Sequence, residues 1–170
     1  MTRYVALLRA VNVGGTGKLP MDELKAMCQA AGFAEVRTYI ASGNVVFGSR
    51  LGEKAVKQAL EQQLQGYAGK PVGVVVRTAA EMAAVLAANP FPEAPANRTV
   101  AIFLDAPPAT TALQDVTGTD GERLVLGRRE IYVHYGGGMA DSQLKIPAAK
   151  AGTARNMNTI AKLAAMAAAR

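Results

Sequence analysis

The stretch of residues 4–20 constrains the fold most strongly, because three local signals follow one another in it. An apolar run up to Leu8 predicts a buried strand. Glycines at positions 14, 15 and 17 then break the strand, and Pro20 suits the first turn of a helix. A strand that leads through a glycine loop into a helix can present backbone N–H groups to a ligand.

The rest of the first half predicts a helix, a hairpin, a second helix and a last strand. Apolar residues at helical spacing predict helices over 21–31 and 53–64, and residues 35–41, 45–47 and 71–77 read as strands. The order β-α-β-β-α-β from residue 3 to residue 77 is the ferredoxin-like arrangement.

The second half repeats this pattern in part. It predicts a helix over 81–88, a strand over 99–104, a short helix over 110–116, a hairpin of 123–126 with 130–135, and a terminal helix over 156–169. No clear last strand follows, so the repeat is incomplete or varied. We therefore expect an α+β protein of two ferredoxin-like halves packed into one unit, residues 1–78 and 79–170.

The net charge of +6 is spread unevenly, because no acidic residue follows Asp141 while five basic residues do. Such a segment favours phosphates or nucleic acid, or it serves solubility alone. One cysteine, Cys28, and one histidine give no disulfide and no metal-ligand spacing, so we expect no metal site and no cofactor. No apolar run is long enough for a membrane helix. We expect a cytoplasmic protein with no membrane partner.

Three polar segments are candidates for a binding site. The glycine loop offers Arg9, Asn12, Gly14 and Gly15, although it matches neither a P-loop nor a dinucleotide fingerprint and also suits a plain strand-to-helix connection. Ser42 and Asn44 flank Gly43, where turn chemistry is the competing explanation.

The third segment runs from residue 155 to residue 159. Arg155, Asn156 and Asn158 exceed what capping one helix requires, and they would suit an acceptor-rich group such as phosphate. We expect the three segments to meet around one concave region.

These segments also carry a resemblance to a known family. Residues 7–15 (LLRAVNVGG), 38–47 (TYIASGNVVF) and 153–159 (TARNMNT) resemble the bacterial domain-of-unknown-function family 1697. The resemblance implies two ferredoxin-like halves and no established activity. The family usually carries Trp where this chain has Met157, so the resemblance implies packing rather than stacking at that position.

The residues therefore predict a protein that binds a phosphate-bearing ligand, a nucleotide or a nucleic acid, at a polar site. One alternative is a small transferase or hydrolase acting on a phosphorylated metabolite, although no acid–base pair points to it. Another is a protein-interaction module. For nucleic acid, Tyr132, His134 and the Arg128-Arg129 pair would form a stacking surface. The sequence leaves the oligomeric state and the identity of the ligand open.

Overall fold

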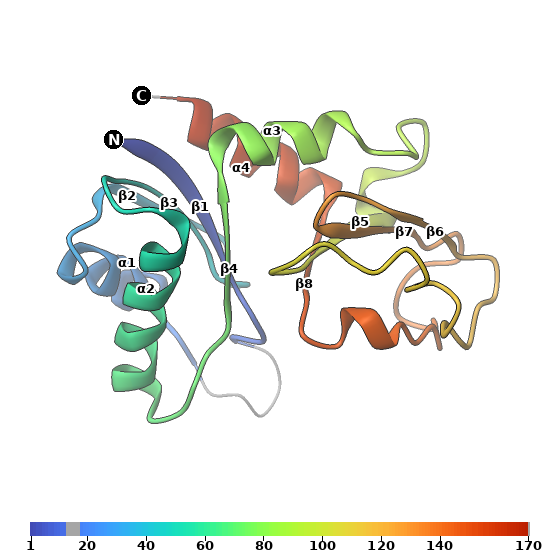
Figure 1. Cartoon of the computed structure of the whole chain (residues 1–170), viewed down its shortest axis with the longest axis horizontal. Helices are drawn as coiled ribbons and strands as arrows, with labels where there is room; N and C mark the ends of the chain where they lie inside the picture. The colour runs from blue at the N-terminus through green and yellow to red at the C-terminus, as the bar shows by residue number, and fades with distance from the viewer. Residues whose placement is uncertain (13–17, 170) are drawn as a thin grey trace. The chain divides into compact units, whose positions relative to one another are not determined.

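The described part of the chain is an α+β fold with two four-stranded antiparallel sheets and four α-helices (Figure 1). The computed structural model describes residues 1–12 and 18–169. The chain divides into two compact units. Unit 1 comprises Met1–Ala83 and Lys162–Arg170, and unit 2 comprises Ala84–Ala161. The predicted halves, 1–78 and 79–170, and their ferredoxin-like character stay predictions.

Unit 1 has the β-α-β-β-α-β order that the sequence predicts. Its elements are β1 (Thr2–Leu8), α1 (Met21–Ala30), β2 (Ala34–Tyr39), β3 (Asn44–Ser49), α2 (Glu53–Ala68) and β4 (Val74–Thr78). The strands lie in the order β2-β3-β1-β4, and every neighbouring pair is antiparallel. The helix α3 (Ala79–Ala87) begins in unit 1.

The core of unit 1 lies between one face of this sheet and the helices α1 and α2 (Figure 1). Alternate residues of β1, namely Tyr4, Ala6 and Leu8, belong to one apolar cluster with the inward residues of both helices. The predicted stripe on α2 is confirmed, since Val56, Leu60 and Leu64 are all buried. Each such side chain stabilises the fold by roughly 1.5–3 kcal/mol. Cys28 lies in the same cluster, and burial raises the pKa of its thiol to about 12.

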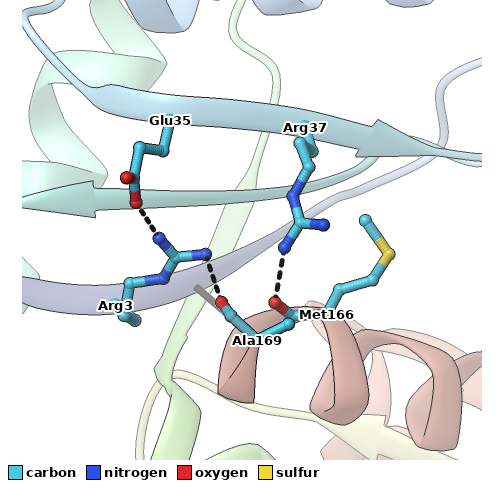
Figure 2. Close-up of polar contacts among 5 residues, drawn as sticks. All are labelled: Arg3, Glu35, Arg37, Met166 and Ala169. Atoms are coloured by element: carbon cyan, nitrogen blue, oxygen red, sulfur yellow. Dashed lines mark hydrogen bonds and ion pairs between the residues drawn. The ribbon is translucent and has the colours of Figure 1, made fainter.

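The sheet of unit 1 also holds the C-terminal end of α4 (Met157–Ala168). Arg37 on β2 donates to the Met166 carbonyl at 2.7 Å, and Arg3 on β1 donates to the Ala169 carbonyl at 3.2 Å (Figure 2). Arg3 is itself paired with Glu35. The last carbonyls of a helix have no partners within it, and cations favour that end of the helix dipole. The two arginines therefore cap α4 from outside the helix.

Unit 2 contains the second sheet. Its elements are the short 3₁₀ turns η1 (Ala96–Arg98) and η2 (Pro147–Ala149) and the strands β5 (Thr99–Phe103), β6 (Arg123–Leu126), β7 (Glu130–His134) and β8 (Thr153–Asn156). The strands lie in the order β6-β7-β5-β8. Val100, Ile102, Ile131 and Val133 form the core on one face, where the long segments before β6 and before β8 add further apolar side chains.

Two sequence predictions for unit 2 are wrong. Residues 110–116 form turns rather than a short helix. Thr153–Asn156 is a strand, because β5 offers a free edge and pairs antiparallel with it, Ala101 opposite Arg155. The last strand that the sequence did not reveal is therefore β8, and α4 begins one residue later than predicted. No helix in the described residues is long and apolar enough to cross a membrane.

Candidate functional site

Asn12 ties together the loops at one end of the unit 1 sheet. Its Nδ2 donates to the carbonyls of Leu19, at 2.9 Å, and Ala41, at 2.7 Å, while its Oδ1 accepts from the Leu19 N–H at 2.6 Å. The whole amide is thus engaged by backbone. The side chain joins the segment before α1 to the turn between β2 and β3, so Asn12 positions these loops. Its predicted role as a ligand residue stays a prediction.

Ser42 and Asn44 form part of the same loop region. Asn44 is fully buried at the start of β3, and its Nδ2 donates to the Tyr39 carbonyl at 2.8 Å and to Ser42 Oγ at 2.9 Å. The competing explanation from the sequence, turn chemistry, accounts for these contacts. The structure brings Arg9, Asn12, Ser42 and Asn44 to one end of unit 1. The predicted ligands Gly14 and Gly15 lie outside the described residues.

Backbone strain marks the same loops. Ala10, Asn12 and Ile40 have φ angles of 54°, 56° and 49°. Asn tolerates this left-handed region, but for Ala and especially for β-branched Ile it is unfavourable. Residues held in such conformations occur preferentially at functional sites.

A pocket with a volume of about 740 Å³ lies beside these loops, within unit 1. Three cations, Arg9, Lys18 and Lys70, line it, and no carboxylate does among the described residues. We call it the basic pocket. Its apolar lining includes Val11 and Leu19 from the loop before α1, Leu64 and Tyr67 from α2, and Val72 before β4.

The backbone just after β1 and the backbone just before β4 meet at the basic pocket. The Arg9 N–H donates to the Gly73 carbonyl at 2.9 Å, and a side-chain carbon at position 73 would lie 3.6 Å from Arg9 Cβ. Arg9 therefore packs over Gly73 at the rim of the sheet. The sequence predicts Arg9 as a site residue but does not predict Lys70 or Tyr67. The Gly69-Lys70-Pro71 turn signal marks a loop there, but nothing in it shows that the loop faces Arg9.

The third predicted segment, residues 155–159, belongs to unit 2, whereas Arg9 and Asn12 belong to unit 1. That the three segments form one concave region therefore stays a prediction. Arg155 is a strand residue, only 9% exposed, and its guanidinium donates to the Ala154 carbonyl at 2.9 Å. Burial lowers its pKa to about 10. Asn156 Oδ1 accepts from the Thr159 N–H at 2.9 Å and caps α4, whereas Asn158 is exposed. Met157 is buried, in line with a packing role.

The stacking surface suggested for nucleic acid is wrong in its central residue. Tyr132 is 2% exposed, and its hydroxyl donates to the Val85 carbonyl at 2.8 Å. The His134 ring lies 5.9 Å from the Phe91 ring, centroid to centroid, and His134 Nδ1 is 3.3 Å from Thr99 Oγ1. The alternation of β7 places Tyr132 on a buried face, so no base can stack on its ring.

Unit 2 has a pocket of the opposite charge, with a volume of about 380 Å³. Asp120, Glu122 and Asp141 line it together with Tyr135. Burial, and then the charge of Glu122, raise the pKa of Tyr135. Among the described residues no group of three or more His, Cys, Asp and Glu side chains is arranged to hold a metal ion. An anionic ligand is repelled here and favoured in the basic pocket.

The family model described as "Protein of unknown function (DUF1697)" matches residues 1–132. The chain belongs to this family. The match includes the motifs at 7–15 and 38–47, which surround the loops described above. Among solved structures, the conserved bacterial protein SP0830 from Streptococcus pneumoniae is similar over 98% of each chain, with 24% identity and a TM-score of 0.79. At this identity the likeness shows the fold alone. No curated protein matches the chain.

Proposed function

We propose that this member of the DUF1697 family binds a phosphate-bearing ligand in the basic pocket. The observation that carries the proposal is the charge of the lining: Arg9, Lys18 and Lys70 surround one cavity, and no described lining residue is acidic. An Arg can hold two phosphate oxygens at once, and Lys acts as a point charge on the same group. The volume of about 740 Å³ falls in the range of small-molecule sites.

The polar residues of the neighbouring loops support the pocket indirectly. Asn12, Ser42 and Asn44 use their side chains to hold the two loops, which fixes the backbone from which Arg9 and Lys18 project. A preorganised site loses less entropy when a ligand binds.

The enzyme alternative has less support at this pocket. The described lining has no carboxylate, histidine, serine or cysteine side chain. General acid–base or nucleophilic catalysis most often uses such a group next to the substrate, whereas the described lining offers only Tyr and Lys side chains for this role, and these serve less often. We therefore propose binding, with the transferase or hydrolase reading as the second candidate. Nucleic acid stays a proposal for the acid-free segment after Asp141.

Thermal unfolding with a panel of phosphates tests the proposal. The panel contains inorganic phosphate, a nucleoside monophosphate, a series of alkyl phosphates and a single-stranded oligonucleotide. A compound present at a hundred times its Kd stabilises the folded state by about 2.7 kcal/mol, which raises Tm. If no compound in the panel raises Tm, the proposal is wrong, and an interaction module becomes the better reading.

A pair of matched double variants locates the effect. Lys18→Ala with Lys70→Ala removes two charges from the basic pocket, and we expect it to reduce affinity at least tenfold. Lys25→Ala with Lys54→Ala removes two exposed charges from α1 and α2 outside the pocket lining. The control is expected to bind normally. Equal losses in the two variants would mean that the effect is general electrostatics and that the pocket is not the site.

A further inference from the structure

The lining of the basic pocket has a second property besides charge: apart from its three cations and the Tyr67 hydroxyl, its described side chains are apolar. The lining includes Val11, Leu19, Leu64, Tyr67 and Val72, and the remaining described residues are alanine, proline and glycine. No Ser, Thr, Asn, Gln, Asp or Glu side chain lines it in the described part of the chain. A nucleobase bound here would leave its edge donors and acceptors facing apolar side chains, which is costly.

The two helix ends at the pocket act differently on an anion, although one cation, Lys70, follows the end of α2. Lys18 and Leu19 lie just before the N-terminus of α1, where the helix dipole favours an anion. Leu64, Tyr67 and Ala68 come from the last turns of α2, whose C-terminal carbonyls disfavour one. A phosphate therefore fits beside Arg9 and Lys18, and an apolar group fits against the end of α2.

Tyr67 provides the surface for that apolar group. It is 47% exposed, which makes it one of the few large apolar side chains left uncovered, and it lines the pocket next to Leu64, which is fully buried. A hydrocarbon chain lying on Tyr67 would remove apolar surface from water, at about 25 cal/mol for each Å² buried.

We propose that the ligand of the basic pocket is an alkyl phosphate, a phosphate monoester of a single hydrocarbon chain. This inference rests on the proposed phosphate-binding function and names the class of molecule. The three cations hold the phosphate, and the apolar lining at the end of α2 holds the chain. Charge complementarity selects a phosphate over a neutral alcohol, and the lack of polar side chains in the described lining selects a hydrocarbon body over a nucleobase.

Calorimetric titration of the full chain with butyl, hexyl and octyl phosphate tests this proposal, with each probe kept below the concentration at which it forms micelles. Burial of a methylene group is worth about a fourfold gain in affinity, so we expect two- to fourfold tighter binding for each added methylene. Octanol and adenosine monophosphate serve as comparisons, and both are expected to bind more weakly than octyl phosphate.

Two variants separate the head from the chain. Tyr67→Ser is expected to flatten the chain-length dependence and to leave butyl phosphate binding nearly unchanged, because Tyr67 contacts only the chain. Lys18→Ala with Lys70→Ala is expected to weaken all three alkyl phosphates by the same factor. The double variant of Lys25 and Lys54 is again the control.

The outcomes distinguish this inference from the function on which it rests. The proposal of an alkyl phosphate is wrong if the affinity does not depend on chain length, or if adenosine monophosphate binds more tightly than hexyl phosphate. Either result leaves the proposed phosphate-binding function in place. Octanol binding as tightly as octyl phosphate overturns the phosphate function and the inference with it. The same holds if none of these probes binds.

Discussion

Gly43 lies where the end of β1 passes the turn between β2 and β3. Its φ is 90°, and its carbonyl accepts the Leu8 N–H at 2.8 Å. A Cβ built on it would come within 2.6 Å of Val11 Cγ2 and 2.9 Å of Leu8 Cβ. Glycine is therefore required twice here, for the left-handed backbone and for the close approach of the two segments.

We expect Gly43→Ala to lower the free energy of unfolding by about 2–5 kcal/mol, because left-handed strain of about 1–2 kcal/mol adds to an overpacking cost of about 1–3 kcal/mol. Urea denaturation measures this change. Gly66→Ala is the matched control, since Gly66 is an exposed residue of α2 with nothing within 4 Å of its added Cβ. Helix propensity predicts a gain of roughly 0.5–1 kcal/mol there. Equal effects of the two substitutions would contradict the packing argument.

The sequence reveals at the residue scale which side chains are unusual, but not what they contact. Asn12 and Asn44 stand out as polar residues beside glycines, and both turn out to hold backbone carbonyls. The same amide could bind a ligand or a carbonyl, and only the path of the neighbouring chain decides between them. The sequence does not show that Lys70 and Tyr67 lie beside Arg9, because their place there depends on contacts between segments some sixty residues apart.

At the scale of elements, the sequence predicts the long elements with a strong apolar pattern correctly, but it does not predict all of the short ones. The helix α2 follows from apolar residues four apart, and β1 follows from a continuous apolar run. By contrast β8 has only four residues, and three of them, Thr153, Arg155 and Asn156, are polar or charged; Thr and Asn are typical of a helix start. Pairing with β5 overrides that local preference, which is how tertiary context limits sequence-based prediction.

The helix α4 depends on side chains that the sequence places far from it. Its last turn holds no basic residue of its own, so Arg3 and Arg37 provide the cations for its free carbonyls (Figure 2). We expect Arg37→Ala to cost about 0.5–1.5 kcal/mol, the net range for one intramolecular hydrogen bond. Arg37→Lys should recover part of this loss.

Hydrogen exchange shows whether the loss is local. Amides in the last turn of α4 should exchange faster in Arg37→Ala, while those of α2 remain protected. Arg50→Ala, which removes an exposed arginine outside this contact, is the control. A uniform change across both helices would mean that Arg37 acts on global stability and does not hold the end of α4.

Most of the net positive charge of the molecule comes from the residues near its C-terminus. Residues 1–141 carry 14 basic and 13 acidic side chains, whereas residues 142–170 carry five basic and none acidic. Arg155 is buried, so the exposed charge of the described part of this segment lies on Lys145, Lys150 and Lys162. The structure thus reduces the predicted nucleic-acid segment to three lysines.

Three lysines set the salt dependence to expect. Each phosphate contact on a single strand contributes about 0.7 to the slope of log K against log salt, so the slope for a short oligonucleotide should be at most about 2 in magnitude. Lys145→Gln, Lys150→Gln and Lys162→Gln together should bring the slope close to zero. A triple variant of Lys25, Arg50 and Lys54 changes the net charge equally and should keep the slope. Fluorescence anisotropy across a salt series measures both. If the two triple variants behave alike, or if no oligonucleotide binds at low salt, nucleic acid is excluded as a partner of this segment. The three exposed lysines then serve solubility, and the basic pocket of unit 1 is left as the anion site.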